Sequence, residues 1–511
     1  MLAYTNSIGL MGIDGFKVSV QTDISGGLPS FDIVGLPDAA VKESKERVRS
    51  AIRNSGFDFP SRRIVINLAP ARIKKEGPAY DLSIAMSTLA ATGQIEIPDN
   101  DKTIFIGELS LDGSLNPVMG VLPMVISAYK NGFTNIFVPY QNAKEAAILE
   151  NINVYPVHSL KELTEHFFGF GKIEPLKNDT DAYFADKTEN IIDFADVKGQ
   201  ESAKRALEIA AAGGHNILLI GSPGTGKTML AQRLCTILPD MTFDEALEVT
   251  KIHSIAGTLK KDSPLVAVRP FRNPHHTISS SGLSGGGTIP RPGELSLAHN
   301  GVLFLDELPE FKRDALEAMR QPLEDGQVTI SRVNATLTYP CNIMLICSMN
   351  PCKCGFFGDP VRQCTCSDAQ INQYRSRVSG PLLDRIDMHI EIAPVDFDDL
   401  SSKSRGESSA EIKKRVDRTR KIQTERYKKY GIYSNAQLRA GLIEEFCPIG
   451  EDETTLLKTA FDNLGLSARA HSRILKVART IADLDQSENI SMMHIAEAIQ
   501  YRSLDRKFFG N

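Results

Sequence analysis

One eight-residue segment constrains the fold of this 511-residue chain more than any other feature. Residues 221–228 read GSPGTGKT, which has the spacing G-x-x-x-x-G-K-[ST], and they directly follow the apolar run at 216–220. A glycine-rich loop in this position lets consecutive backbone N–H groups, and the N-terminus of the next helix, face an anion. The segment therefore predicts a strand, a phosphate-binding loop and a helix in a parallel α/β sheet, and it indicates an NTPase.

Each residue type in this loop has a task in phosphate binding. Glycines let the backbone wrap closely around phosphate oxygens, Lys227 would reach the β and γ phosphates, and the Thr228 hydroxyl would bind Mg²⁺. The alternative is a chance glycine-rich turn, which the flanking strand and the predicted helix disfavour. The predicted nucleotide-binding residues of the loop are Gly221, Ser222, Pro223, Gly224, Thr225, Gly226, Lys227 and Thr228.

Two carboxylates follow the apolar run at 302–305. Asp306 and Glu307 have the positions of a Walker B pair at the end of a buried strand. Asp306 would bind in the Mg²⁺ shell, and Glu307 would orient or polarise the attacking water. Acidic residues are also common at solvated strand ends, but a pair downstream of a phosphate-binding loop favours catalysis.

Two further residues complete the predicted hydrolytic site. Asn350 ends the third apolar run, where its amide would position the hydrolytic water. Arg385, in GPLLDRID at 380–387, is a candidate to reach the γ-phosphate of a neighbouring subunit; such arginine fingers raise NTPase rates about 10³- to 10⁵-fold. The alternative is a surface cluster of ion pairs among Asp384, Arg385 and Asp387. A finger that acts between subunits requires a ring.

The length favours several domains, because one hydrophobic core rarely serves a chain of this size. Residues 1–170 are predicted to form a mixed α/β domain, with strands at 16–20, 64–68 and 135–138, a helix from Asp38 to Gly56 and another at 123–130. Residues 171–192 are polar without a sustained apolar period, and we interpret them as a linker.

The second half of the chain has a different pattern. Residues 193–400 alternate short apolar runs with amphipathic helices, as a parallel sheet covered by helices requires. Residues 401–511 are predicted to be wholly helical.

Four of the eight cysteines lie within fifteen residues, at Cys352, Cys354, Cys364 and Cys366. The start of the chain lacks a secretory signal and no run of about 18 apolar residues occurs, so we expect a cytoplasmic protein without a membrane segment. In a reducing compartment such a cluster favours metal over disulfides, and four thiolates suffice for a structural, tetrahedral Zn²⁺ site. Two C-x-C pairs are less usual than C-x₂-C pairs, and thiols without metal or a redox switch are the alternatives.

Several longer segments resemble the magnesium-chelatase-like AAA+ ATPases, and more closely the YifB/ComM group. They are the phosphate-binding loop, FRNPHHTISSSGLSGGG at 271–287, RPGELSLAHNGVLFLDELPEF at 291–311, PLEDGQVTISR at 322–332 and GPLLDRIDMH at 380–389. DFADVKGQESAKRALEIAAAGGHNILLIG at 193–221 and GLSARAHSRILKVARTIADL at 465–484 resemble the group too. The resemblance therefore covers nearly the whole chain.

This resemblance implies an AAA+ core at 193–400 with a C-terminal helical lid at 401–511, the ligands ATP and Mg²⁺, and a homo-hexameric ring. It implies that Asn350 is the sensor 1 residue and that Arg469 is the sensor 2 arginine that contacts nucleotide, with Arg473 as the competing candidate. For function it implies an ATP-driven helicase that promotes branch migration of single-stranded or branched DNA in natural transformation. The rival hypotheses are a chelatase-type motor subunit and a protein-remodelling or regulatory ATPase without a nucleic-acid substrate.

Residues 1–170 resemble the Lon-protease-like domain of the same group, of the ribosomal protein S5 domain 2 type. Lon-type peptidases carry a nucleophilic serine in D-G-P-S-A-G and pair it with a lysine. Here residues 76–81 read EGPAYD, so that Ala79 stands at the serine position, and residues 113–124 contain no lysine. Ser83 lies outside the motif. The resemblance thus implies a scaffold or contact surface that is not a peptidase.

Contact with DNA would depend on a local basic surface, because the formal charge of the chain is −5. The segment at 411–421 and the residues just beyond it are rich in lysine and arginine. These cations would either meet phosphates or belong to a solvated helix whose partners are Glu411, Asp417 and Glu425.

Two further segments carry expectations for the structure. PLEDGQVTISR is interpreted as a hairpin that turns at Asp325 and Gly326, a shape that ring motors project into a central pore, with Lys312 and Arg332 as candidate pore contacts. The adjacent His275 and His276 are expected to point in different directions, which favours a loop role over a metal site, with a substrate or pore contact as the alternative.

Overall fold

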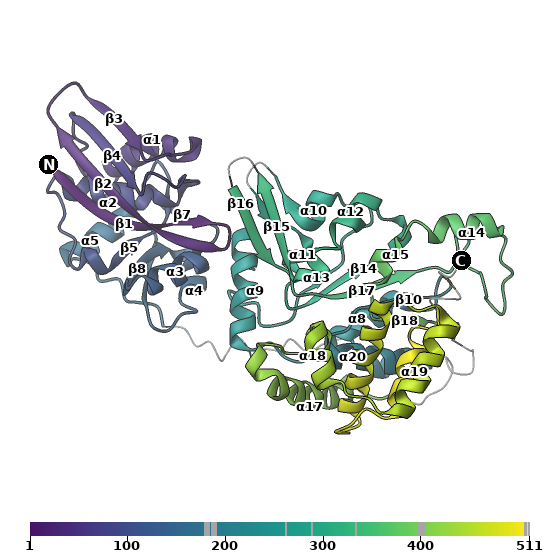
Figure 1. Ribbon diagram of the computed structural model, residues 1–511. Helices are drawn as coiled ribbons and strands as arrows, with labels where there is room; N and C mark the ends of the chain where they lie inside the picture. The colour runs from purple at the N-terminus through teal and green to yellow at the C-terminus, as the bar shows by residue number, and fades with distance from the viewer. Residues whose placement is uncertain are drawn as a thin grey trace. The chain divides into compact units, whose positions relative to one another are not determined.

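The computed structural model describes residues 1–177, 184, 192–260, 263–287, 290–332, 335–395, 405–504 and 508 (Figure 1). The chain forms two units. The first comprises Met1–Asp186 and Phe243–Ala267, and the second comprises Lys187–Thr242 and Val268–Asn511. Among the described residues, no helix is both long enough and apolar enough to cross a membrane.

A four-stranded sheet with the order β1-β2-β4-β3 forms one part of the first unit (purple in Figure 1). Its strands are β1 (Leu2–Met11), β2 (Asp14–Ser25), β3 (Ser30–Val34) and β4 (Arg63–Ala69). β1, β2 and β4 pair antiparallel, whereas β3 runs parallel to β4 because the helix α1 (Ala39–Asn54) connects them. The helix α2 (Asp81–Ala91) packs against β1, β2 and α1.

The helix α1 forms as its sequence predicts. Oδ1 of Asp38 accepts the N–H of Val41 at 2.7 Å and so caps the first turn. The chain leaves the helix at Gly56, which has a φ of 90°. The apolar side chains of the predicted face are buried: Val41, Val48, Ala51 and Ile52.

The rest of the first unit contains a parallel sheet with the order β5-β8-β9. Its strands are β5 (Thr103–Phe105), β8 (Asn135–Pro139) and β9 (Asn153–Val157), beside a short hairpin of β6 (Glu108–Leu109) and β7 (Leu115–Asn116). The helices of this part are α3 (Val121–Lys130), α4 (Ala143–Ala146) and α5 (Leu160–Phe168).

The helix α9 (Phe243–Ala256) belongs to the first unit, although it follows the phosphate-binding loop in sequence. It packs against α3, and the hydroxyl of Ser254 donates to Oε1 of Glu145 at 2.5 Å. The carbonyl of Ser254 accepts the N–H of Gly120 at 3.2 Å. Burial raises the pKa of Glu145, against the opposing effect of the Ser254 hydrogen bond. This division of the chain differs from the predicted boundaries, which place α9 in the ATPase core.

A parallel sheet with the order β11-β14-β17-β10-β18 forms the centre of the second unit. Its strands are β10 (Ile217–Ile220), β11 (Phe271–Arg272), β14 (Val302–Leu305), β17 (Met344–Met349) and β18 (Met388–Glu391). Every residue of β10, β14 and β17 is buried, as expected for strands covered on both faces. Buried side chains of the helices α7 (Glu201–Gly213) and α8 (Lys227–Ile237) belong to the same hydrophobic core. The predicted parallel α/β core is therefore confirmed.

Short elements connect the strands of this sheet. They are α10 (Ser280–Ser284), α11 (Glu294–Leu297), α12 (Arg313–Ala318), α13 (Pro322–Asp325), α14 (Asp368–Arg375), α15 (Gly380–Leu383), β12 (Gly285–Gly286) and β13 (Arg291–Pro292).

The predicted hairpin is present, but its turn lies elsewhere. Its strands are β15 (Gln327–Arg332) and β16 (Ala335–Pro340), which pair antiparallel. Gly326 has a φ of 66° and follows the end of α13, so Asp325 and Gly326 terminate a helix instead of turning a hairpin. Residues 333–334, which join the strands, and the side chain of Arg332 lie outside the described residues.

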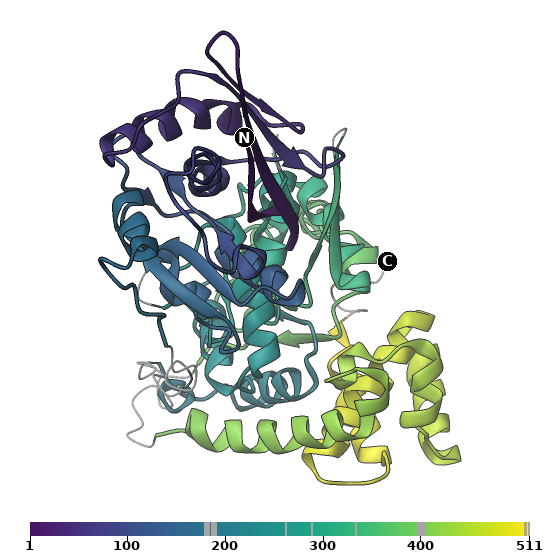
Figure 2. The ribbon, with the colours of Figure 1, turned by 90° about the vertical axis from the view of Figure 1, so that its left-hand side faces the viewer.

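The C-terminal helical region is confirmed as well (green to yellow in Figures 1 and 2). Its helices are α17 (Ser409–Tyr427), α18 (Ala440–Phe446), α19 (Glu451–Leu464), α20 (Ala468–Leu484) and α21 (Met492–Gln500). The long helix α17, in light green, lies at the bottom of Figure 2. Buried side chains of α17 and α20 belong to the same hydrophobic cluster as those of α7, α8 and the sheet.

The predicted linker at 171–192 is described only in part. Residues 178–183 and 185–191 lie outside the described residues. Ile173 is buried in the core of the first unit, and the N–H of Leu176 donates to the carbonyl of Val154 at 2.8 Å. The first part of this segment is therefore fixed to the N-terminal unit.

Candidate functional site

Three neighbouring strands bring the predicted site residues to one edge of the sheet. β17 lies between β14 and β10. Gly221 directly follows β10, Asp306 follows β14 and Asn350 follows β17. Because parallel strands end at the same edge of a sheet, these residues meet there, where open α/β sheets bind ligands.

The phosphate-binding loop needs glycine at several positions. Gly224 and Gly226 have φ angles of 83° and 86°, a conformation that other residues rarely adopt. A Cβ atom at Gly221 would lie 2.6 Å from the carbonyl oxygen of Ile392. Gly226 directly precedes α8, so the loop delivers the N-terminus of that helix to the site. These features are the ones that a phosphate-binding loop needs.

The ammonium group of Lys227 lies inside this loop. Its Nζ donates to the carbonyl oxygens of Gly221 at 2.7 Å and Ser222 at 3.0 Å, and to Oδ1 of Asn350 at 3.2 Å. Burial lowers the pKa of Lys227, while the Walker B carboxylates act in the opposite direction. A partly desolvated cation in a phosphate-binding loop is a strong partner for a phosphate.

Asp306 is held from two sides. Oγ1 of Thr228 donates to its Oδ2 at 2.9 Å, and the hydroxyl of Ser348 donates to its Oδ1. A carboxylate beside a hydroxyl provides the oxygen ligands that Mg²⁺ prefers, so this pair fits the ion. Sequence reasoning missed Ser348. The available signal was its position two residues before Asn350, because side chains two apart on a strand share a face.

Glu307 presents its carboxylate to solvent and to one histidine. Its side chain is 57% exposed, and its Oε2 lies 3.8 Å from Nδ1 of His276. The backbone of Glu307 is left-handed (φ 56°, ψ 49°), and its N–H donates to Oγ of Ser348 at 3.3 Å. Left-handed residues other than glycine are uncommon and gather at functional sites.

The expectation that His275 and His276 point apart was wrong. Their ring centroids lie 4.1 Å apart at an interplanar angle of 33°. The loop after β11 turns here, so adjacent residues do not alternate as they do in a strand, and Nδ1 of His275 lies 2.9 Å from Oγ1 of Thr277. Because the loop turns, His276 lies near the carboxylate of Glu307.

Arg385 is bound to groups of its own chain. Its Nη2 pairs with the carboxylate of Glu324, and its Nε donates to the carbonyl oxygen of Arg320 at 2.9 Å. Only 10% of the side chain is exposed. Arg385 thus pairs with Glu324 rather than with Asp384 or Asp387, the partners of the alternative prediction.

The lid helix α20 carries both candidate sensor 2 arginines. Arg469 lies exposed in its first turn. Arg473 pairs with the buried carboxylate of Asp387, and its Nη1 donates to the carbonyl oxygen of Arg385 at 3.0 Å. Because Arg473 already neutralises a buried acid, Arg469 is the more available arginine for a ligand.

Asp387 connects the lid to the core. Its Oδ2 accepts the N–H of Asn216 at 2.9 Å and lies 3.7 Å from Nδ1 of His215, whose Nε2 lies 2.7 Å from Oγ1 of Thr480. Burial would raise the pKa of Asp387, but the Arg473 guanidinium and His215 hold it well below its usual range. Burial also lowers the pKa of His215, against the effect of Asp387.

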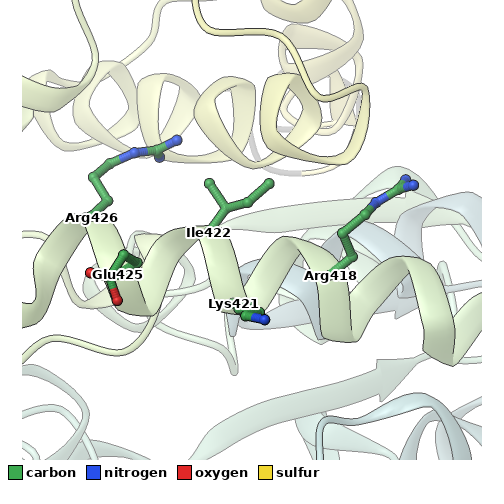
Figure 3. A pocket seen from close by; sticks show the side chains of 5 residues that line it. All are labelled: Arg418, Lys421, Ile422, Glu425 and Arg426. Atoms are coloured by element: carbon green, nitrogen blue, oxygen red, sulfur yellow. The ribbon is translucent and has the colours of Figure 1, made fainter.

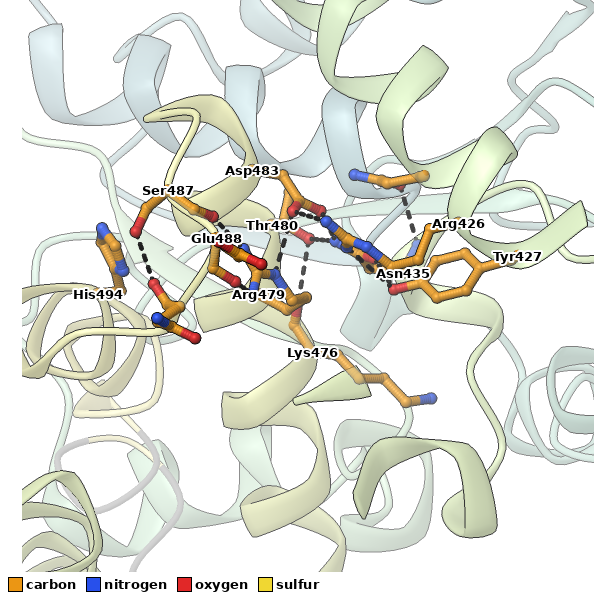
Figure 4. Close-up of polar contacts among 12 residues, drawn as sticks. Arg426, Tyr427, Asn435, Lys476, Arg479, Thr480, Asp483, Ser487, Glu488 and His494 are labelled. Atoms are coloured by element: carbon orange, nitrogen blue, oxygen red, sulfur yellow. Dashed lines mark hydrogen bonds and ion pairs between the residues drawn. The ribbon is translucent and has the colours of Figure 1, made fainter. Parts of the chain in front are cut away.

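A buried polar network continues from Thr480 through the lid (Figure 4). Nδ2 of Asn435 donates to Oγ1 of Thr480 and to Oδ2 of Asp483, both at 2.9 Å. The hydroxyl of Tyr427 donates to Oδ1 of Asn435 at 2.6 Å, and Arg426 pairs with Asp483 at 2.6 Å. These bonds fix α17 to α20, since breaking one leaves a buried polar group unsatisfied.

The four clustered cysteines converge. Sγ of Cys352 lies 3.4 Å from that of Cys354 and 3.7 Å from that of Cys364, and the latter two are 3.5 Å apart. With Cys366, all four sulfurs lie within 4.8 Å of one another. Four Zn–S bonds of about 2.3 Å in a tetrahedron place the sulfurs about 3.8 Å apart. The donor set and its spacing fit a tetrahedral thiolate site for a metal ion.

The pKa values of Cys354 and Cys364 are shifted in opposite directions. Burial would raise the pKa of Cys354, but the backbone N–H groups of Phe356 and Thr365 outweigh it and lower the pKa to about 5. The N–H of Cys366 lowers the pKa of Cys364, but burial and the neighbouring sulfurs raise it to about 12. A metal ion bound among these sulfurs would stabilise their thiolate forms.

The N-terminal unit does not present a serine nucleophile at the Lon position. Ala79 is buried in a short turn before α2. Ser83 is fully buried, and its hydroxyl lies 2.8 Å from Oγ1 of Thr5. Lys75 is also buried; its Nζ donates to the carbonyl of Pro70, and burial lowers its pKa. Ser83 is thus bound within the core and is not accessible to a polypeptide substrate.

Part of the charge of the cationic helix α17 is paired within the same unit, and part of it is exposed. Lys413 pairs with Asp240 at 3.1 Å and Arg415 pairs with Glu208 at 2.5 Å, so part of the charge is used within the unit. The exposed face carries a basic stripe of residues spaced four and three apart: Lys414, Arg418 and Lys421. In the described part of the chain these three make no ion pair. A shallow pocket of about 480 Å³ beside the stripe is lined by Arg418, Lys421, Ile422, Glu425 and Arg426 (Figure 3).

The fold and the site together define a P-loop NTPase with a helical lid. Three family models match the chain: magnesium chelatase, subunit ChlI, over residues 193–400; subunit ChlI of Mg-chelatase over 20–142; and magnesium chelatase, subunit ChlI C-terminal, over 406–502. The YifB protein of Salmonella typhimurium strain LT2 is 44% identical over 99% of this chain and 98% of its own length. The competence protein ComM of Haemophilus influenzae is 43% identical over the same shares. The chain belongs to the YifB/ComM family of magnesium-chelatase-like AAA+ ATPases.

A partial similarity connects the chain to a second family. The Lon protease of Brevibacillus choshinensis is 27% identical over 165 residues, which are 30% of this chain and 21% of the protease. Lon protease 2 of Bacillus subtilis is 31% identical over 125 residues. The Lon-like resemblance read from residues 76–81 agrees with these matches.

The structure brings some predicted site residues together and leaves others apart. The phosphate-binding loop contacts Asp306 through Thr228 and Asn350 through Lys227. Arg385 is bound to Glu324 instead. Sequence reasoning missed the hydroxyl of Ser348, which binds Asp306, and it favoured a loop role for His276, which lies near Glu307.

Proposed function

We propose that this protein is a ring-forming ATPase that drives branch migration of DNA during recombination of incoming DNA. The observation that carries the proposal is the contact of Thr228 with Asp306, and of Lys227 with Asn350, at the carboxyl edge of the sheet. Family membership supports the motor activity. The name of the Haemophilus relative, competence protein ComM, supports the context of DNA uptake.

Each group at this edge has a task in ATP hydrolysis. Lys227 and the N–H groups of the loop bind the phosphates, and Thr228 and Asp306 would hold Mg²⁺, which neutralises charge on the phosphates when bound. Glu307 is the acceptor for a proton of the attacking water, and His276 sets the direction of its carboxylate. Asn350 positions the same water while it shares its Oδ1 with Lys227.

The proposed assembly is a homo-hexameric ring, in which Arg385 would act between subunits. Its guanidinium binds Glu324 and the carbonyl of Arg320, not a group of the nucleotide site of its own chain. In a ring it would stabilise the charge on the γ-phosphate of the neighbour. Arg469, exposed at the start of α20, is the proposed sensor 2 contact within the subunit.

The DNA contact that we favour is the basic stripe of α17. Its cations are not used by carboxylates of the described chain, and they span about 10 Å, because seven helical residues rise about 1.5 Å each. Cations so placed can meet successive phosphates of a single strand. The cytoplasm is the compartment that supplies both the DNA and the ATP for this activity.

The cysteine cluster is proposed to hold one structural Zn²⁺ ion. Thiolate ligands select zinc over Mg²⁺, and four of them leave no open position for a substrate. The same compartment keeps such thiols reduced.

The decisive experiment measures ATP turnover with and without forked or four-way DNA, at several stated salt concentrations, with the Lys227→Ala variant as the inactive control. We expect stimulation by DNA that weakens as salt rises, and migration of the branch only with hydrolysable ATP. Absence of both stimulation and salt-sensitive binding would overturn the DNA substrate. Stimulation by an unfolded protein instead would favour the remodelling ATPase, and stimulation by a porphyrin-binding partner would favour the chelatase-type motor.

The N-terminal unit is proposed to be a scaffold without peptidase activity. Ala79 carries no nucleophile, and Ser83 is sealed in the core. Incubation of the full chain with casein, ATP and Mg²⁺ should release no peptides, and Ser83→Ala should change only the stability. Peptide release that Ser83→Ala abolishes would contradict this role.

A further inference from the structure

The loop that carries the cysteine cluster also touches the phosphate-binding loop. Gly355 has a φ of 88°, and a Cβ atom there would lie 2.5 Å from Cδ of Pro223. The hydroxyl of Ser222 donates to Oδ2 of Asp359 at 2.6 Å. Two separate points of the cysteine loop therefore contact two consecutive residues near the start of the phosphate-binding loop.

Asp359 is oriented for this contact by its own loop. Its Oδ1 accepts the backbone N–H groups of Val361 at 2.9 Å and of Arg362 at 2.8 Å, which leaves Oδ2 for Ser222. The hydrogen bond from Ser222 and those two N–H groups lower the pKa of Asp359. The contact to Ser222 is thus a charge-assisted hydrogen bond, which is about twice as strong as a neutral one.

In the sequence, both contact points, Gly355 and Asp359, lie between the two pairs of cysteines. Cys352 and Cys354 precede Gly355, and Cys364 and Cys366 follow Asp359. A metal ion bound by both pairs closes the segment between them into a loop with fixed ends. Without that closure the segment regains conformational entropy, which weakens any contact that depends on its shape.

The N-terminal end of the cysteine cluster lies close to β17, the strand that Asn350 follows. Asn350 precedes Cys352 by two residues, and Nε of Arg375 donates to the carbonyl oxygen of Pro351 between them at 3.1 Å. The Arg375 guanidinium lies 4.7 Å from the ring centroid of Phe357 in the same loop. The cluster therefore connects the residue that binds Lys227 with the loop segment that binds Ser222.

We propose that metal binding by Cys352, Cys354, Cys364 and Cys366 holds this loop against the phosphate-binding loop, so that zinc occupancy sets the affinity for nucleotide. Asp359 is the positioning residue, because it transmits the shape of the metal loop to Ser222. The glycine-rich loop must be ordered before it can bind phosphate, and anchoring Ser222 and Pro223 removes part of that entropic cost before the ligand arrives. This inference rests on the proposed ATPase function but not on the DNA substrate.

The first test is nucleotide binding by the full chain in two metal states. A fluorescent ADP analogue is titrated in excess Mg²⁺, once with Zn²⁺ bound and once after treatment with a zinc-selective chelator. We expect the Kd to rise about tenfold without zinc, which corresponds to about 1.4 kcal/mol, and to recover when Zn²⁺ alone is returned. Equal, measurable affinity in both states would overturn the inference while leaving the ATPase proposal intact. No nucleotide binding in either state would overturn both.

The second test separates the positioning role from general damage to the fold. In zinc-loaded protein, Asp359→Ala should raise the KM for ATP about tenfold, with a smaller change in kcat and an unchanged zinc content. Asp359→Asn keeps an acceptor for the Ser222 hydroxyl and should therefore recover most of the affinity for ATP. Asp368→Ala, an exposed acid in the first turn of α14, is the matched control and should behave like the parent protein. An unchanged KM in fully zinc-loaded Asp359→Ala would contradict the proposal.

Cysteine variants provide a third test of the link between zinc binding and nucleotide affinity. Cys352→Ser should lower both zinc content and nucleotide affinity, and added Zn²⁺ should not restore them. Cys447→Ser, at a buried cysteine after α18, should leave both unchanged. Cys352→Ser protein that loses zinc and keeps its nucleotide affinity would refute the link between the two sites.

Discussion

Nδ1 of His276 lies 3.8 Å from Oε2 of Glu307. The histidine comes from the loop after β11 and the glutamate from the end of β14, two strands that are neighbours in the sheet. In the part of the chain that the structure describes, the proposed catalytic carboxylate therefore lies within ion-pair distance of His276, on a loop for which the sequence favoured a structural role.

Glu307→Gln is expected to bind ATP with unchanged affinity and to lose hydrolysis, because the amide cannot accept a proton from water. The expected loss in kcat is about 10²- to 10⁴-fold, the usual contribution of a general base. Single-turnover rates and nucleotide titration check both parts. Glu310→Gln, which removes an exposed carboxylate three residues away, is the matched control and should keep its activity. Persistent hydrolysis by Glu307→Gln would assign the water to another residue.

His276→Phe is expected to lower kcat less than Glu307→Gln does. The variant keeps an aromatic ring beside His275 but removes the nitrogen that faces Glu307. His275→Phe is the paired control, because Nδ1 of His275 lies 2.9 Å from Oγ1 of Thr277 rather than beside the carboxylate. Equal losses in the two variants would mean that the loop, and not the contact to Glu307, matters for turnover.

Arg385→Ala is expected to bind nucleotide almost normally and to lose about 10³- to 10⁵-fold in kcat, the effect of an arginine finger. Mixing it with Lys227→Ala subunits should restore part of the activity, since some interfaces then contain an intact loop and an intact finger. Glu324→Gln, which removes the partner of Arg385 in the same chain, should not reduce the rate. A mixture as inactive as its components would argue against a shared site.

Stability should fall in mild acid because of His215. Its pKa is lowered from 6.5 in the folded protein, so the unfolded chain binds the proton more readily. The contribution of neutral His215 to the free energy of unfolding is present above about pH 6.5 and is lost as the pH falls toward the pKa of His215 in the folded protein. The lowered pKa of Asp387 extends the same loss of stability to stronger acid. We expect the midpoint of urea unfolding to drop between about pH 7.5 and about pH 5.5.

His215→Gln should flatten this dependence on pH. His471→Gln, at an exposed position of α20, should leave it intact. If the midpoint of His215→Gln fell as steeply as that of the parent protein, another group would have to be responsible.

Replacing Lys414, Arg418 and Lys421 together by glutamine should weaken DNA binding and reduce its dependence on salt. Each phosphate of single-stranded DNA that the variant no longer neutralises lowers the slope of log K against log salt by about 0.7. Fluorescence anisotropy with a single-stranded oligonucleotide at four salt concentrations measures the slope. Lys458→Gln, at an exposed lysine of α19, should not change it. An unchanged slope in the triple variant would exclude the stripe as the DNA-binding surface.

The sequence was informative wherever a local pattern decides the structure. The apolar runs of β10, β14 and β17 predicted buried parallel strands, because only strands covered on both faces are apolar throughout. The same parallel order then forces the residues after these strands to one edge. The capping residue Asp38 and the αL residue Gly56 marked the ends of α1 for equally local reasons.

What the sequence could not indicate depends on contacts between distant segments. Asp325 and Gly326 fit a hairpin turn and a helix end equally well, and only the preceding helix α13 decides between them. Glu324 as the partner of Arg385, and Asp359 as the partner of Ser222, are separated from those residues by 61 and 137 positions. No periodicity extends over such distances.

The position of α9 governs the order in which the chain can fold as it is synthesised. Residues 1–177 leave the ribosome first, but the helix that supplies Ser254 to the buried Glu145 is made only after the phosphate-binding loop and α8. The N-terminal unit is therefore complete only after residues 243–267, from the middle of the chain, have been synthesised. Dividing the chain near residue 187 would remove α9 from the first unit and leave it in the second half without its partner α3. The two halves of the sequence are therefore not modules that recombination could exchange separately.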